Sequence, residues 1–106
     1  GCLDFVLYQQ NSEMRNNCFH IPEPIGESKI SPQELDLVLL PLLGFDRQGN
    51  RLGMGAGYYD RTFHAIKKPV LCGLAYEKQC VEDLPHDDLD VRLNAVMTEK
   101  QIIYFR

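Results

Sequence analysis

Residues 35–40, which read LDLVLL, decide the fold of this chain. They form a nearly continuous apolar run of strand length that ends at Pro41. Because such a run is apolar on both faces, it predicts a central strand that is covered on two sides of a sheet. A second run of this kind, VLCGLA at 70–75, predicts another buried strand.

The residues between these two strands predict a crossover connection. Residues 44–51 carry turn chemistry. A helix is expected from Tyr58, with Lys67 and Lys68 in its last turn and Pro69 as its stop. Its apolar face is formed by residues at i, i+4 and i+7, namely Tyr59, Phe63 and Ile66. Strand, loop, helix and strand in this order imply a parallel crossover.

The remaining segments predict further short elements. We expect strands at 2–8, 95–98 and 101–105, an extended proline-containing loop at 19–31 and a short helix at 77–84. The fold class that follows is α/β, a three-layer sandwich with a mostly parallel sheet. Since the chain opens without Met in a strand-like run, we expect a partial domain that lacks its N-terminal elements.

Composition narrows the class of function. The chain has 106 residues, is 44% hydrophobic and 25% charged, and carries a formal net charge of −4. No basic stripe interleaves with aromatic residues, which argues against nucleic-acid binding. No apolar run approaches the roughly 20 residues that span a bilayer, and no signal peptide is visible, so we expect no membrane partner. The four cysteines form no CxxC pair, which favours free thiols and a cytoplasmic location.

The Gly-rich loop at 51–61, which reads RLGMGAGYYDR, carries the strongest functional signal. Gly53, Gly55 and Gly57 alternate ahead of the predicted helix, so a ligand can approach bare backbone N–H groups. Such a nest suits phosphates, and Arg51 and Arg61 flank it as charge-assisted donors. The loop is neither a Walker A motif nor GxGxxG, so on pattern alone a structural turn remains an alternative.

The Gly-rich loop is part of a longer signature that resembles a known family. Phe45-Asp46, the run 49–53, Gly55 and the run 57–61 together resemble the signature of 5-formyltetrahydrofolate cyclo-ligases. The same family is resembled, in order and spacing, by residues 35–41, 73–79, 84–85 and 90–99, and weakly by residues 21–24. The resemblance identifies residues 1–106 as the C-terminal, ATP- and Mg²⁺-binding part of a single cyclo-ligase domain.

This resemblance implies an enzyme. Cyclo-ligases convert 5-formyltetrahydrofolate to 5,10-methenyltetrahydrofolate with ATP and Mg²⁺, and release ADP and phosphate. In the family the formyl oxygen takes the γ-phosphoryl group, N10 of the folate attacks the activated carbon, and phosphate leaves. That chemistry asks the protein for positioning and charge neutralisation. The resemblance thus implies a cytoplasmic C–N bond-forming ligase, monomeric when complete, with 5-formyltetrahydrofolate as its small-molecule substrate.

The resemblance also implies site residues. Asp60 matches the family's aspartate at the metal, and Asp90 matches its second metal-associated aspartate, in agreement with the preference of Mg²⁺ for carboxylate oxygens. Arg51 and Arg61 are the catalytic candidates, because they can neutralise the phosphates. The residues expected to wrap ATP are Arg51, Leu52, Gly53, Met54, Gly55, Ala56, Gly57, Tyr58 and Tyr59.

Simpler interpretations stand beside several of these roles. Asp60 is also explained as a charge at a helix N-terminus, Asp90 as a member of a solvated acidic loop, and Arg61 as a partner of Asp60. Between the two tyrosines we favour Tyr58 as the ring that faces folate or adenine and Tyr59 as part of the core.

Two departures from the family keep other functions open. Some relatives carry a basic residue where Ala56 stands, and no region before Gly1 matches the family's basic N-terminal helix and folate-cradling residues. One alternative is a truncated, non-catalytic nucleotide- or phosphate-binding module of the same fold. Another is a domain like a sugar-phosphate isomerase or CoA-transferase, for which no acid–base or nucleophilic carboxylate stands out.

Overall fold

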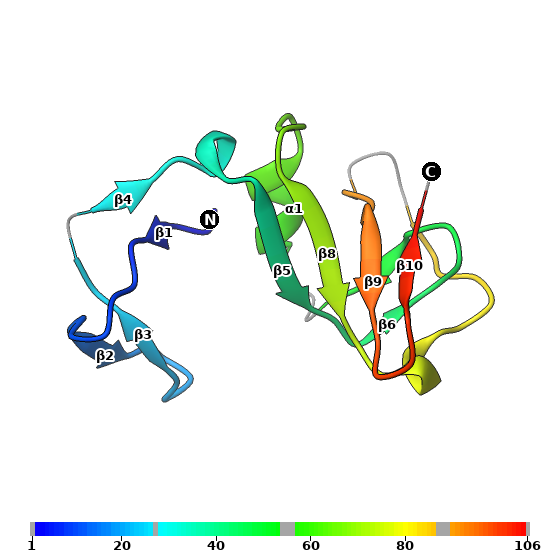
Figure 1. Cartoon of the computed structure of the whole chain (residues 1–106), viewed down its shortest axis with the longest axis horizontal. Helices are drawn as coiled ribbons and strands as arrows, with labels where there is room; N and C mark the ends of the chain where they lie inside the picture. The colour runs from blue at the N-terminus through cyan, green and yellow to red at the C-terminus, as the bar shows by residue number, and fades with distance from the viewer. Residues whose placement is uncertain (1, 27, 54–56, 87–89, 106) are drawn as a thin grey trace.

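A four-stranded mixed sheet forms the centre of the molecule (Figure 1). The computed structural model describes residues 2–26, 28–53, 57–86 and 90–105. The strands lie in the order β10-β9-β8-β5, and their bounds are β5 Leu37–Pro41, β8 Val70–Leu74, β9 Ala95–Met97 and β10 Ile102–Tyr104. β8 pairs in parallel with β5 and with β9, and β10 pairs antiparallel with β9. The predicted α/β class with a mostly parallel sheet is confirmed.

Short ladders and single turns complete the described chain. The strand pairs are β1 (Phe5–Val6) with β4 (Lys29–Ile30), β2 (Met14–Asn16) with β3 (Pro22–Pro24), and β6 (Gly44–Phe45) with β7 (Arg51–Leu52). The 3-10 turns are η1 (Pro32–Glu34) and η2 (Glu77–Gln79). The first two ladders form an arm beside the sheet in Figure 1. A hydrogen bond of 2.8 Å from Leu3 N to Thr62 Oγ1 ties this arm to α1.

The crossover helix is shorter than predicted. α1 spans Tyr58–Phe63, so Lys67 and Lys68 lie beyond its end and not in its last turn. The physical reason is that the chain must turn back into the sheet, where Val70 N donates to Asp36 O at 2.9 Å. The helix predicted at 77–84 is likewise wrong in extent, because only η2 forms before Cys80 bridges to Phe45.

The core lies on one face of the sheet, which we call the covered face. Its side chains are Val38, Leu40, Leu71 and Val96, each at most 6% exposed. Phe63 of α1 belongs to the same buried cluster, and Figure 1 shows α1 behind β5 and β8. Burial of each such side chain stabilises the fold by about 1.5–3 kcal/mol. The predicted apolar stripe of α1 is confirmed, since Tyr59 and Ile66 also pack against this cluster.

β5 differs from its prediction. It is an edge strand of the described sheet, not a central one. Its exposure alternates, with Val38 and Leu40 buried but Leu37 55% and Leu39 52% exposed. The pattern predicted cover on two faces, whereas in the described residues only one face is covered.

The cysteines match the prediction of free thiols. Cys72 is buried, Cys80 is partly buried, and Cys2 and Cys18 are exposed, all four with free thiols. Among the described residues, no helix has the length and apolar character needed to cross a membrane.

Candidate functional site

Two arginines lie against the glycines at either end of the Gly-rich loop. Arg51 Nη1 is 3.1 Å from the position that a Cβ of Gly53 would take, and Arg61 Nη1 is 3.0 Å from that of Gly57. Gly57 has φ +69°, a left-handed conformation that favours glycine. Both ends of the loop therefore present a guanidinium group, as the sequence predicted. The predicted phosphate contacts of Met54, Gly55 and Ala56 fall outside the described residues.

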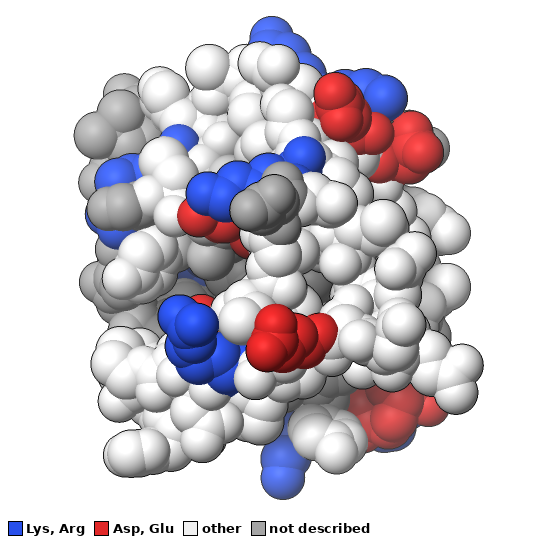
Figure 2. All heavy atoms as spheres, turned by 90° about the vertical axis from the view of Figure 1, so that its left-hand side faces the viewer, with Lys and Arg blue, Asp and Glu red and all other residues white. Residues whose placement is uncertain are grey.

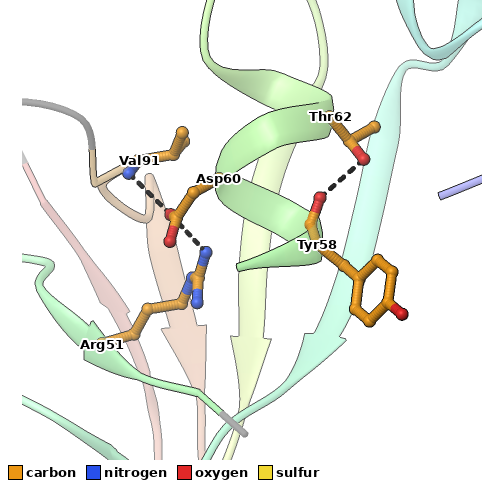
Figure 3. A network of polar contacts seen from close by, with 5 residues as sticks. All are labelled: Arg51, Tyr58, Asp60, Thr62 and Val91. Atoms are coloured by element: carbon orange, nitrogen blue, oxygen red, sulfur yellow. Dashed lines mark hydrogen bonds and ion pairs between the residues drawn. The ribbon is translucent and has the colours of Figure 1, made fainter. Parts of the chain in front are cut away.

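Asp60 connects three separate segments of the site (Figure 3). Its Oδ1 accepts a hydrogen bond from Arg51 Nη2 at 2.8 Å and another from the backbone N–H of Val91 at 2.9 Å. The carboxylate sits in the first turn of α1, Arg51 comes from β7, and Val91 follows the acidic loop at 85–90 of the sequence. The side chains of Arg51 and Asp60 are only 8% and 25% exposed, so this ion pair is partly shielded from water.

The two aspartates predicted at the metal lie on adjoining segments. Asp90 is the residue before Val91, whose N–H binds Asp60, so the fold brings positions 60 and 90 together across 30 residues of sequence. Asp90 is exposed and makes a contact of its own. In the ranges that the structure describes, no three His, Cys, Asp or Glu side chains gather into a metal-binding group. Two carboxylates still fit Mg²⁺, which takes its remaining ligands from phosphates and water.

An open hollow lies beside this junction. It has a volume of about 440 Å³, and its lining includes Asp90, Val91, Lys67 and Arg92. Its other lining residues are Phe63, His64, Ile66, Pro69, Leu71 and Asn94, and Asp90 alone of the described site candidates is among the lining residues.

The two tyrosines occupy different environments. Tyr58 is 44% exposed, and the guanidinium carbon of Arg61 lies 5.3 Å from its ring centre. Tyr59 packs against the core, with Arg51 5.6 Å from its ring centre. Burial raises the pKa of the Tyr59 hydroxyl, although the charge of Arg51 acts to lower it. The core position of Tyr59 is confirmed, and a contact of Tyr58 with a ligand stays a prediction.

Asp46 is a structural residue of the site whose role the sequence analysis missed. It is fully buried, and its carboxylate accepts hydrogen bonds from Gln48 N, Asn50 N, Asn50 Nδ2 and Leu84 N at 2.9–3.1 Å. Burial acts to raise the pKa of Asp46, but these bonds outweigh it and the pKa is lowered. The bonds hold the turn that leads into β7 and so fix Arg51. An Asp four residues before Asn50 in a Gly-containing turn was the signal available.

The charges on one side of the molecule are mixed. Figure 2 shows the side of the molecule that carries the N-terminal arm, where Lys, Arg, Asp and Glu form small separate groups among uncharged residues. The net charge of −4 is consistent with this mixture. This side of the molecule therefore offers no broad basic field that would attract an anion.

Comparisons with known proteins identify the family that the chain resembles. A 5-formyltetrahydrofolate cyclo-ligase from Haemophilus influenzae is 44% identical over 93 residues, which are 84% of this chain and 50% of that protein. The cyclo-ligase of Escherichia coli K12 is 40% identical over 108 residues, with 96% and 58% covered. The solved structure of 5,10-methenyltetrahydrofolate synthetase from Aquifex aeolicus matches with a TM-score of 0.77 and 34% identity. That match covers 92% of this chain and 50% of that one.

The chain spans about half the length of the curated relatives named above. The model of the 5-formyltetrahydrofolate cyclo-ligase family matches residues 1–99. With nearly the whole sequence inside that match, this chain belongs to the 5-formyltetrahydrofolate cyclo-ligase family.

Proposed function

We propose that this chain provides the nucleotide-binding part of an ATP-dependent 5-formyltetrahydrofolate cyclo-ligase. The enzyme converts 5-formyltetrahydrofolate to 5,10-methenyltetrahydrofolate and releases ADP and phosphate. The observation that carries the proposal is the junction at Asp60, which joins Arg51 of the Gly-rich loop to the segment of Asp90. This junction supplies cationic and carboxylate groups of the kind that a polyphosphate and its metal need.

The loop residues bind and orient the phosphates. Backbone N–H groups between Arg51 and Tyr59 donate to phosphate oxygens, and the arginines at its two ends neutralise charge. A guanidinium has five N–H donors, so the bond from Arg51 to Asp60 leaves donors for a phosphate. Because α1 is a single short helix, the loop and its arginines contribute more to this site than a helix dipole does.

Asp60 and Asp90 hold Mg²⁺ in this proposal. When bound, MgATP supplies the phosphoryl group that activates the formyl oxygen. Tyr58 offers an exposed ring beside the loop and lies against the flat ring of the folate. The complete enzyme acts as a cytoplasmic monomer.

Calorimetric titration with MgATP tests the proposal. Asp60→Ala removes a carboxylate that both binds metal and orients Arg51, so we expect the affinity for MgATP to fall about tenfold or more. Asp36→Ala is the matched control, because the Asp36 side chain is 92% exposed and lies at the far end of β5. Equal affinities of the wild type and Asp60→Ala would remove Asp60 from the site.

A non-catalytic nucleotide-binding module is the second candidate. It is favoured by the fact that residues 1–106 span only about half of the relatives' length. A turnover assay with 5-formyltetrahydrofolate and MgATP separates the two candidates. MgATP binding without formation of the methenyl product would identify these residues as the module alone.

A further inference from the structure

The side chain of Gln79 joins two segments of the chain. Gln79 is the last residue of η2, the turn that follows β8, and it is partly buried. Its Oε1 accepts a hydrogen bond from Tyr76 N at 2.7 Å. Its Nε2 donates to Leu42 O and to Leu43 O, both at 3.1 Å. Because a side-chain amide has two N–H donors, both donors of Gln79 are used by these two carbonyl groups.

The two carbonyl groups lie close to the start of the Gly-rich loop. Leu42 and Leu43 follow the last residue of β5 and lead into β6. Leu43 N donates to Leu52 O at 2.8 Å, and Leu52 is the last residue of β7, directly before Gly53. The bonds of Gln79 therefore reach the first residues of the loop through one intervening residue, Leu43.

The ladder of β6 and β7 depends on support of this kind. Each strand has two residues, and an isolated two-stranded ladder is at best marginally stable in water. Cys80 forms a parallel bridge with Phe45, and Val81 N donates to Phe45 O at 2.8 Å. These contacts hold the end of β6, and the side chain of Gln79 holds the residues before its start. Because β7 carries Arg51, the ladder sets where this guanidinium lies.

We propose that Gln79 is a positioning residue, which places Arg51 and the start of the Gly-rich loop and so sets the affinity for the phosphates of MgATP. This inference rests on the proposed function for the identity of the ligand. A role confined to η2 is the simpler interpretation, because Oε1 accepts from Tyr76 N at the start of that turn. The Nε2 bonds leave the turn, so a change that removes only these donors separates the two roles.

Gln79→Glu is that change. An ionised carboxylate keeps an acceptor for Tyr76 N, but it has no donor and faces two carbonyl oxygens. Calorimetric titration at pH 8 should therefore give a Kd for MgATP about fivefold above that of the wild type. A protonated carboxyl group regains one O–H donor, so the ratio of the two Kd values should fall towards one at pH 5.

The matched control is Gln33→Glu. Gln33 is exposed and belongs to η1, the other 3-10 turn of the described chain, which lies ahead of β5. The control makes the same change of charge away from the loop, so its Kd should equal that of the wild type at both pH values.

Amide hydrogen exchange tests the contact without a ligand, and it serves equally where Gln79→Glu fails to fold. Gln79→Ala should speed exchange at Leu43 N–H about tenfold, because the segment that pairs with Leu52 loses its support. Exchange at Asn94 N–H, which bonds to Leu71 O at the amino end of the sheet, should stay unchanged. Equal acceleration at both amides would show a global loss of stability and overturn the proposal.

The outcomes also separate this inference from the proposed function. A wild type that does not bind MgATP overturns the proposed function, and exchange at Leu43 then decides alone whether Gln79 holds the start of the loop. A wild type that binds MgATP no more tightly than Gln79→Glu at pH 8 overturns the inference. So does a raised Kd ratio for Gln79→Glu that is the same at pH 8 and at pH 5.

Discussion

The two faces of the sheet are built from the same kinds of residue and meet opposite surroundings. In β5, Leu40 lies on the covered face and is fully buried, while its neighbour Leu39 lies on the opposite face, which we call the open face, and is 52% exposed. The difference teaches that apolar composition reports the environment for which a strand is built, and the described residues provide only half of that environment. The covered face should therefore dominate the stability of residues 1–106, and the open face should contribute little to it.

The largest difference in stability between substitutions on the two faces is expected at Leu40. Leu40→Ala leaves a cavity in the covered face and should lower the free energy of unfolding of residues 1–106 by about 3 kcal/mol. Leu39→Ala, one residue away on the open face, should lower it by less than about 1 kcal/mol. Urea denaturation of both variants measures the contrast. Equal losses would mean that the two faces are packed alike.

A substitution of Asp46 tests whether buried hydrogen bonds beside the covered face stabilise the fold as much as apolar packing does. Asp46→Ala leaves the N–H donors of Asn50 and Leu84 without their acceptor. It should lower the free energy of unfolding, measured by urea denaturation, by about 2–3 kcal/mol.

The same residue predicts a pH dependence. Because the folded pKa of Asp46 lies below its ordinary value of 3.8, its ionised form stabilises the fold fully above pH 3.8 and loses this effect as the pH falls through the folded pKa. The wild type should therefore lose its stability advantage over Asp46→Asn on acidification. A constant advantage from pH 6 down to acid unfolding would contradict the assigned hydrogen bonds.

The smallest loss of stability is expected for a substitution at Gly73, which tests how tightly the covered face is packed. A Cβ at Gly73 would lie 2.6 Å from Leu42 Cδ2 and 3.1 Å from Leu93 Cδ1. Gly73→Ala should therefore destabilise residues 1–106 by about 1–2 kcal/mol through overpacking. Gly26→Ala is the control, since its Cβ would make an ordinary contact of 3.6 Å with Val6. Thermal unfolding of both variants decides whether the covered face can accept a methyl group.

The strands could be predicted from sequence, and the helix lengths could not. Runs of apolar residues locate β5, β8, β9 and β10, because the residues that a strand buries follow one another closely in the sequence. The end of α1 depends instead on the bond from Val70 to Asp36, which belongs to the sheet and leaves no local pattern. The edge position of β5 was missed for a similar reason, since composition cannot tell which layers are present.

The site was predictable in its members more than in its contacts. The position of Asp60 in the first turn and of Tyr59 in the core followed from helical periodicity. The bond from Val91 N to Asp60 spans 31 residues of sequence, and no short-range rule predicts it. The sequence marks Asp46 only as part of the family signature, because its four hydrogen bonds form only once the turn is folded.

One oxygen atom of Asp60, Oδ1, accepts hydrogen bonds from both the side chain of Arg51 and the backbone N–H of Val91. A ligand that binds this oxygen competes with both hydrogen bonds at once. Its binding therefore loosens β7 and the segment after the acidic loop together. Thermodynamic linkage is reciprocal: if a bound ligand disfavours the ordered form of either segment by some factor, ordering of that segment weakens binding of the ligand by the same factor.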